Sequence, residues 1–89
     1  MGDKKLQSVQ VLLFSAIREQ AGIDSTTLPL DPGEAVSAGA LLERLATTYP
    51  SIRPMLPLVR IAVNQEYAPK EHMVRAGDEV ALITPVSGG

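Results

Sequence analysis

The stretch "SAGALLERLATTYP", residues 37–50, decides the fold, because it is the only long amphipathic helix that the sequence predicts. Its apolar residues recur three and four positions apart, which places them in one stripe along a helix. These residues are Ala38, Leu41, Leu42, Leu45, Ala46 and Tyr49. Ser37 is typical of a helix N-cap, and Pro50 ends the helix. The apolar stripe has to be buried against some other element, and the rest of the chain supplies strands.

Segments on both sides of this helix have the composition of β-strands, since they are rich in Val, Ile, Leu and Thr and are bounded by turn residues. They are residues 8–14, 25–30, 59–64, 65–68 and 79–84. Pro29 cannot donate to a strand ladder, so it predicts an edge strand. Asn64 tolerates left-handed geometry, so it predicts a turn. We therefore expect an α+β fold in which one mixed sheet of four to five strands carries the main helix across one face.

The remaining segments predict shorter features. Ser15 as N-cap and Gly22 as a stop indicate a helix of about two turns between them. Residues 31–34, "DPGE", have turn chemistry, and residues 51–58, with two prolines, predict an irregular connector. Residues 70–79 are polar and include a Gly-Asp turn. The sequence has no repeat and no linker, so residues 1–89 are expected to form a single domain.

The first strand is apolar on both sides. One side carries Val9, Val11 and Leu13, and the other carries Leu12 and Phe14. Because the chain lacks a second long helix, we expect Leu12 and Phe14 to be partly exposed, together with Ile83 if its parity matches. An exposed apolar patch of this kind predicts a surface for a partner protein.

Composition excludes several function classes. The formal net charge is −2 and aromatic residues make up 3% of the chain, which argues against a nucleic-acid surface. The chain has no cysteine, which excludes disulfides, thiolate metal sites and a cysteine nucleophile. No apolar run approaches the roughly 18 residues of a membrane span, and the N-terminal residues lack signal-peptide order. We expect a soluble, cytoplasmic protein that binds neither nucleic acid nor membrane.

Residues that could carry catalysis are few. His72 is the only histidine, and no second ligand stands at a useful spacing, so we expect a solvated loop residue and no metal site. Asp78 and Glu79 are adjacent on a strand and point to opposite faces. The sequence has neither a phosphate-binding loop nor a nucleophile–base pair. We therefore expect a protein that is not an enzyme on its own and that holds no cofactor.

The C-terminal stretch "PVSGG", residues 85–89, is the remaining candidate for function. Glycine has no side chain to block a narrow channel, and these five residues span at most about 17 Å when extended. Ordering such a tail costs about 5–10 kcal/mol, and burying Val86 returns only about 1.5–3 kcal/mol. We expect a flexible tail that is threaded into a partner, with the docking energy supplied by the folded body.

The chain also resembles a known family in four motifs: "FSAIREQAG" (14–22), "GALLERLATTYP" (39–50), "IAVNQEY" (61–67) and "AGDEVALITPVSGG" (76–89). Together they are similar to the MoaD branch of the MoaD/ThiS sulfur-carrier family, which contains the small subunit of molybdopterin synthase. The resemblance runs from about Val9 to Gly89 and implies a ubiquitin-like β-grasp fold. It departs from the family at Thr84, where the first of two prolines often stands, and "DPGEAVS" is slightly longer than usual.

The resemblance implies a cycle in which a ubiquitin-activating-like adenylyltransferase uses ATP to adenylate Gly89. A sulfur donor then converts the terminus to a thiocarboxylate. The tail, which is Pro85, Val86, Ser87 and Gly88 before the terminal Gly89, enters the large subunit of molybdopterin synthase. There, residues of the large subunit transfer sulfur to cyclic pyranopterin monophosphate and form molybdopterin. The family usually assembles as two small and two large subunits, and Phe14 and Ile83 map to its docking face.

Three alternatives stay open at this point. A sulfur carrier for thiazole synthesis or tRNA thiolation differs only in the final acceptor. A ubiquitin-like protein modifier would form isopeptide bonds through Gly89. A passive ubiquitin-like binding module would make no chemical use of its tail.

Overall fold

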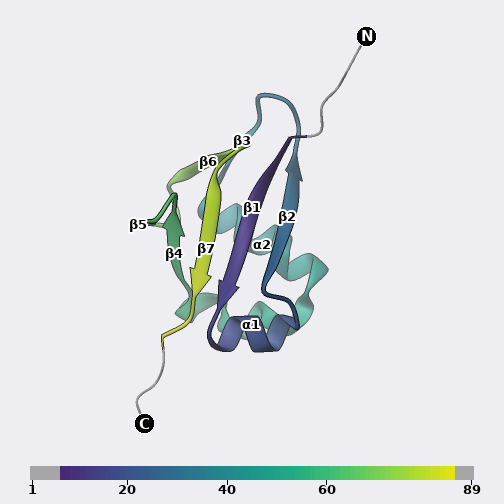
Figure 1. The fold of residues 1–89 in the computed structure, drawn as a ribbon, viewed down its shortest axis with the longest axis vertical. Helices are drawn as coiled ribbons and strands as arrows, with labels where there is room; N and C mark the ends of the chain where they lie inside the picture. Colours follow the sequence, from purple (N-terminus) through teal and green to yellow (C-terminus); the bar gives the residue numbers. More distant parts are fainter. Residues whose placement is uncertain (1–6, 86–89) are drawn as a thin grey trace.

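The chain folds around one mixed sheet, as seen in a computed structural model that describes residues 7–85 (Figure 1). The elements in chain order are β1 (Gln7–Phe14), α1 (Ala16–Ala21), β2 (Ser25–Leu30), β3 (Ala35–Ser37), α2 (Ala38–Thr48), the 3₁₀ helix η1 (Pro50–Leu58), β4 (Arg60–Val63), β5 (Glu66–Ala68), β6 (Met73–Arg75) and β7 (Glu79–Ile83). The five-stranded sheet has the order β2-β1-β7-β4-β5. Strands β1 and β7 are parallel, and the other neighbours are antiparallel.

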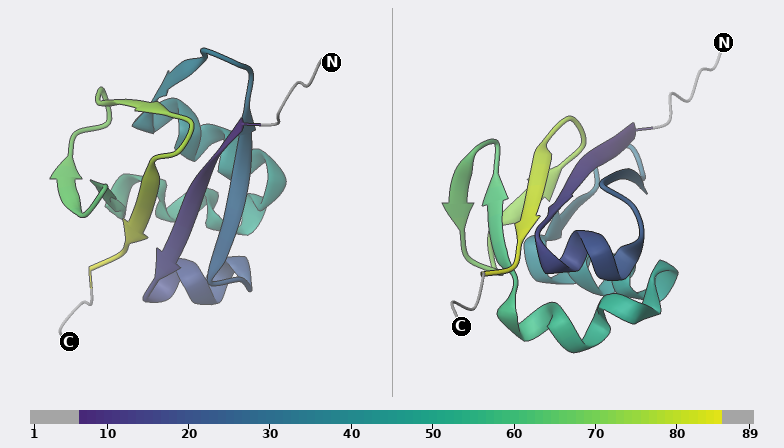
Figure 2. Two further views of the ribbon diagram at one scale, coloured as in Figure 1. Left: turned by 45° about the horizontal axis from the view of Figure 1, so that its top comes forward. Right: turned by 60° about the horizontal axis from the view of Figure 1, so that its bottom comes forward.

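The main helix α2 lies across one face of this sheet, behind it in Figure 1, and Figure 2 shows the same layering from two further directions. The predicted fold class, a mixed sheet with one main helix on one face, is confirmed. Strand β2, which contains Pro29, lies at the edge of the sheet as predicted. Strand β7 occupies the centre, so the last strand of the described chain is held between β1 and β4.

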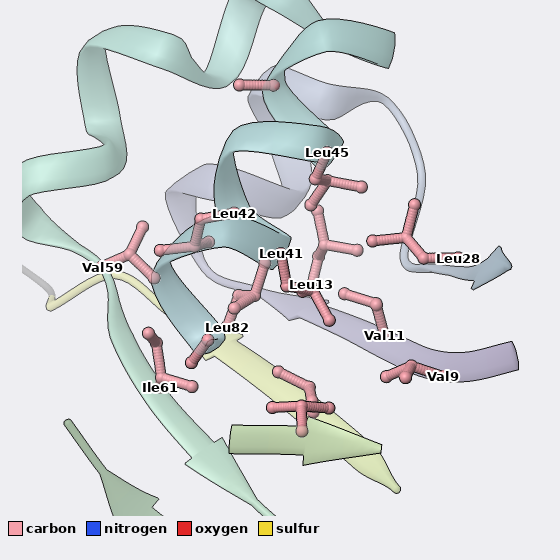
Figure 3. Packing of buried hydrophobic residues seen from close by; sticks show 14 of the residues in the cluster. Val9, Val11, Leu13, Leu28, Leu41, Leu42, Leu45, Val59, Ile61 and Leu82 are labelled. Atoms are coloured by element: carbon pink, nitrogen blue, oxygen red, sulfur yellow. The ribbon is translucent and has the colours of Figure 1, made fainter. Parts of the chain in front are cut away.

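The core lies between α2 and the sheet, and alternate residues of the strands enter it (Figure 3). On the helix, Leu41 and Leu45 are almost completely buried. The strand residues of the core include Val9, Val11, Leu13, Ile61, Val63, Val80 and Leu82. Complete burial of one such side chain contributes about 1.5–3 kcal/mol, so this layer accounts for most of the hydrophobic stabilisation.

Helix α2 begins as the sequence predicts. The Ser37 hydroxyl oxygen accepts a hydrogen bond from the Ala40 amide at 3.1 Å. The two preceding amides, of Ala38 and Gly39, donate to the carbonyl oxygens of His72 and Lys70 at 2.8 and 2.9 Å. The polar segment before β6 therefore satisfies amides that the first turn of a helix leaves without intrahelical partners.

Helix α1 ends as predicted but begins differently. Gly22 has left-handed geometry, and its amide donates to the Arg18 carbonyl at 3.0 Å. Ser15 occupies the predicted N-cap position, and its carbonyl oxygen accepts from the Arg18 amide at 3.1 Å. Its φ is 63°, however, and its side chain makes no capping hydrogen bond. The hydroxyl oxygen of Thr84 supplies the side-chain acceptor instead, since it accepts from the Ile17 amide at 3.2 Å.

Residues 51–58, predicted to be an irregular connector, instead belong to the 3₁₀ helix Pro50–Leu58. Pro50 stands at the first helical position, where the missing amide hydrogen costs no bond. Ile52 and Leu56 are buried, and they anchor this helix to the core. The prolines in this segment suggested irregularity, but their fixed φ lies within the range of a 3₁₀ helix.

A second, two-stranded sheet was not predicted. Strands β3 and β6 pair antiparallel, and Val36 stands opposite Val74. Both valines are buried and belong to the core cluster. The surrounding polar segment, residues 70–79, hid this strand in the sequence, because three residues are too few to show an alternation.

Candidate functional site

Within residues 7–85, no helix lies across the face of the sheet opposite α2, and the apolar residues of that face are called the open face here. They are Leu12, Phe14, Ala62, Tyr67, Ala81 and Ile83. The strand register brings them together, because residues paired across neighbouring strands point to the same side of a sheet. Leu12 stands opposite Ala81 and Phe14 opposite Ile83. Ala81 in turn pairs with Ala62, and Ala62 with Tyr67.

The exposure of these side chains fits an uncovered apolar surface. Phe14 is 44% exposed and Tyr67 is 72% exposed. Leu12 and Ile83 are intermediate in burial. The structure thus places the three predicted interface residues, Leu12, Phe14 and Ile83, side by side on the same face. Their role in binding a partner stays a prediction.

Tyr67 is a member of the open face that the sequence analysis missed. Its strand, β5, has only three residues, which is too short for a periodic pattern. The sequence signal that could have found it is Asn64, which predicts a turn. In the structure, Asn64 and Gln65 form this turn with φ angles of 51° and 73°. Two central residues with positive φ define a two-residue hairpin, so Val63 must face Glu66 and Ala62 must face Tyr67.

A positively charged margin borders the open face. Arg60 stands opposite Ile83 in the register and is exposed. It lines an open groove of about 420 Å³ together with Val59, Ile61, Tyr67, Ala68, Pro69 and Lys70. Arg60 and Lys70 are the two cationic side chains of this groove. Arg60 therefore places one cationic residue beside Ile83, on the strand that leads into the tail.

The root of the tail follows directly after β7. Thr84 is 2% exposed, whereas Pro85 is exposed. Proline has no amide hydrogen, so it cannot extend the ladder between β1 and β7. The other predicted tail residues, Val86, Ser87, Gly88 and Gly89, lie outside the described residues, and the predicted flexibility of residues 85–89 remains untested.

At the other end of β7, a polar turn confirms the structural role expected for Asp78. Its carboxylate accepts from the Arg75 amide at 2.9 Å and from the Asn64 side-chain amide at 3.1 Å. The side-chain oxygen Oδ1 of Asn64 accepts from the Glu79 amide at 3.0 Å. The bond from the Arg75 amide is the main cause that lowers the pKa of Asp78 below its ordinary value. Asp78 and Asn64 therefore tie two turns together.

Candidate catalytic and metal sites are reported only for the described part of the chain. The His72 side chain is exposed, and the residue contributes to the fold through its backbone carbonyl. Among residues 7–85, no group of three His, Cys, Asp or Glu side chains gathers to hold a metal ion. No helix within this range is long and apolar enough to cross a membrane.

Comparison with known proteins gives one family. Residues 11–89 match the model described as the ThiS family. The molybdopterin synthase sulfur carrier subunit of Dictyostelium discoideum is 38% identical over 82 residues, which cover 90% of this chain and 94% of the relative.

Two solved structures have a similar fold. The crystal structure of SAMP1, a small archaeal modifier protein from Haloferax volcanii, has a TM-score of 0.82 and 28% identity, covering 92% of this chain and 99% of that one. In a complex of subunits 1 and 2 of molybdopterin-converting factor from Helicobacter pylori, the matching chain has a TM-score of 0.62 and 20% identity over 92% of this chain and 99% of its own. These likenesses confirm the expected ubiquitin-like β-grasp fold.

Proposed function

The chain belongs to the ThiS family, and from this membership we propose that it is a sulfur carrier of molybdenum cofactor biosynthesis. The observation that carries the proposal is the extent of the family match, residues 11–89. This range includes both the open face and the Gly88-Gly89 pair. The name of the Dictyostelium relative, a molybdopterin synthase sulfur carrier subunit, supports the choice of cofactor.

The proposed chemistry takes place at Gly89. A carboxylate is a poor electrophile, so ATP first converts it to an acyl-adenylate, with release of pyrophosphate. A sulfide equivalent from a sulfur donor then attacks the acyl carbon, the bond to AMP breaks, and a thiocarboxylate remains. Its sulfur is the group that is delivered to cyclic pyranopterin monophosphate, and two such deliveries form the dithiolene of molybdopterin.

The proposal divides the work between body and tail. Threading residues 85–89 into a narrow site costs about 5–10 kcal/mol of conformational entropy, which the tail itself cannot return. We assign the compensating energy to the open face, where Phe14, Leu12 and Ile83 are available for contact. Among the described residues, those nearest the tail root are apolar, hydroxylic or cationic, so we assign the acid–base chemistry of transfer to the partner.

The proposed partners follow from this division. The Helicobacter structure, a complex of two subunits of molybdopterin-converting factor, supports a large subunit as the docking partner. Two small and two large subunits are the proposed assembly, and a ubiquitin-activating-like adenylyltransferase is the proposed activator. The carrier itself needs no bound cofactor in this scheme. The ATP that activation consumes is a cytoplasmic substrate, so the proposal predicts a cytoplasmic protein.

The test is reconstitution with intact-protein mass spectrometry. Incubation with the adenylyltransferase, ATP and a sulfur donor should increase the mass by the difference between one sulfur and one oxygen atom. Addition of the large subunit and cyclic pyranopterin monophosphate should return the mass to its original value and produce molybdopterin. Deletion of Gly89 should abolish both changes and leave thermal unfolding nearly unchanged. Sulfur transfer by the shortened chain would contradict the proposal.

A protein modifier is the second candidate, and the similarity to SAMP1 at 28% identity favours it over the remaining alternatives. The same activation would then end in an isopeptide bond between Gly89 and a lysine of another protein. Peptide mapping of conjugates in native extracts distinguishes the two functions. A thiocarboxylate without conjugates supports the carrier, and conjugates without molybdopterin formation support the modifier.

A further inference from the structure

Thr84 is the last residue of the described chain that the body holds firmly. It is 2% exposed, and it is the only polar residue among the buried side chains of residues 7–85. Its hydroxyl oxygen accepts from the Ile17 amide at 3.2 Å. The same oxygen lies 3.5 Å from the Phe14 carbonyl oxygen, which is longer than an ordinary O–H···O hydrogen bond. One side chain thus connects the tail root to the start of α1, close to the end of β1.

The bond to Ile17 replaces a local helix cap. The amides in the first turn of a helix need acceptors from outside the helix, and a Ser before the helix usually supplies one. Ser15 has a φ of 63° and makes no such bond. Ile17 is fully buried, so water does not reach its amide in place of Thr84. The start of α1 therefore depends on a residue from the far end of the chain.

The bond also fixes the place where β7 stops. The parallel ladder pairs Phe14 with Ile83, and Thr84 continues the attachment by one residue through its side chain. Pro85 follows without an amide hydrogen and is exposed. The chain consequently leaves the body at a defined point beside Phe14, the most exposed apolar side chain of β1.

We propose that Thr84 is a positioning residue for sulfur transfer, because its hydroxyl fixes where and in which direction the tail leaves the docking face. This inference rests on the proposed function. If the tail leaves the body in the wrong direction, the body still binds its partner. The terminal carbonyl group is then displaced from the position that the reaction requires. Displacement of a reacting group by about 1 Å lowers a rate up to about 100-fold.

The experiment separates docking from transfer in three variants. Thr84→Val removes the hydroxyl and keeps the shape, Thr84→Ser keeps the hydroxyl, and Ser37→Ala removes the cap of α2 as a control for loss of a helix cap elsewhere. Each is prepared with a terminal thiocarboxylate by intein cleavage with sulfide, and single-turnover transfer is measured at saturating large subunit. Chains that end at Pro85 give the affinity of the body alone.

For Thr84→Val, we expect the transfer rate constant to fall about tenfold, within the range for a misplaced reacting group, while the affinity of the chain ending at Pro85 stays within about twofold. Thr84→Ser should restore transfer, and Ser37→Ala should leave it unchanged. Equal transfer by wild type and Thr84→Val would overturn the proposal. Equal losses in Thr84→Val and Ser37→Ala, or a tenfold loss of body affinity, would also overturn it.

The unsubstituted chain is measured first. If its thiocarboxylate transfers no sulfur to the pterin in the large subunit, the proposed function fails, and the role of Thr84 fails with it. If it transfers sulfur and the variants behave alike, only the role of Thr84 fails. Failure of the proposed function is therefore seen with the unsubstituted chain, and failure of the role of Thr84 is seen only with the variants.

Discussion

Two neighbouring residues of β1 show the difference between the two faces of the sheet. Leu13 is 1% exposed and packs under α2, whereas Phe14 is 44% exposed on the open face. Both are large and apolar, and they differ only in parity along the strand. A strand that is apolar on both sides is thus buried on one face and half-exposed on the other, because within residues 7–85 the main helix covers only one face of the sheet.

This difference predicts that stability and partner binding are separable in this molecule. The inner face contributes to folding through burial between the sheet and α2. The open face is half-exposed, so it contributes less to folding, and under the proposed function it is the surface that a partner covers. Substitutions on each face test this separation, and the largest effect is expected on the inner face.

Leu13→Ala should have the largest effect on stability. Truncation of a fully buried leucine typically costs about 2–5 kcal/mol, because transfer energy is lost and a cavity remains. Chemical denaturation measures the change. The folded fraction should bind the large subunit with unchanged affinity, since Leu13 does not reach the open face. A loss of affinity in the folded protein would show that the two faces are coupled.

Phe14→Ala should reverse this pattern. Phe14 is already half-exposed, so its truncation should cost only about 1 kcal/mol of folding stability, below the value for a fully buried side chain. A central aromatic anchor of an interface typically contributes about 2 kcal/mol or more to binding. Titration calorimetry with the large subunit should therefore show a dissociation constant raised by about tenfold or more. Equal affinities of variant and wild type would remove Phe14 from the interface.

Tyr67→Ala measures how far the binding surface extends across the open face. Tyr67 is 72% exposed, and exposed substitutions usually change stability by less than about 0.5 kcal/mol. We expect a smaller loss of affinity than for Phe14→Ala, because Tyr67 lies on the short strand β5, further from the tail. Tyr67→Phe is the control that separates the ring from its hydroxyl group. Unchanged binding by both variants would confine the interface to β1 and β7.

Asp78→Asn should have the smallest effect, and the effect should depend on pH. The pKa of Asp78 is lowered, mainly by the Arg75 amide, so its ionised form stabilises the fold. That contribution is complete above the unfolded-state pKa of about 4 and is lost as the pH falls through the lower folded-state pKa. At pH 7, the free energy of unfolding of the wild type should exceed that of the variant by less than about 1 kcal/mol, because solvent screens this carboxylate. Chemical denaturation at each pH measures it. An equal difference at pH 2 would contradict an ionic origin.

Much of this architecture could be predicted from residues with a local signature. Ser37 and Pro50 bracket α2, and Pro29 marks an edge strand, because capping and proline chemistry act over a few residues. Alternation along β1 separated Leu12 and Phe14 from the core. These features depend on near neighbours in the sequence, and they were predicted correctly.

The features that the sequence did not predict depend on distant partners. Strand β6 exists because Val74 meets Val36, and neither segment is long enough to show a pattern. Thr84 resembles any threonine after a strand until the fold brings Ile17 to its hydroxyl. Its replacement of a family proline marked the position as unusual, although the hydrogen bond that results required the structure.

The central position of β7 has a consequence for how the protein is made. Translation produces the middle strand of the sheet after every other described strand, so β1 and β4 have no common neighbour until Glu79–Ile83 leave the ribosome. Contacts between such distant segments form slowly compared with local ones. Because Ala81 and Ile83 belong to β7, a nascent chain or a fragment cut before Glu79 lacks part of the open face. The open face is therefore complete only after the last described strand has been made.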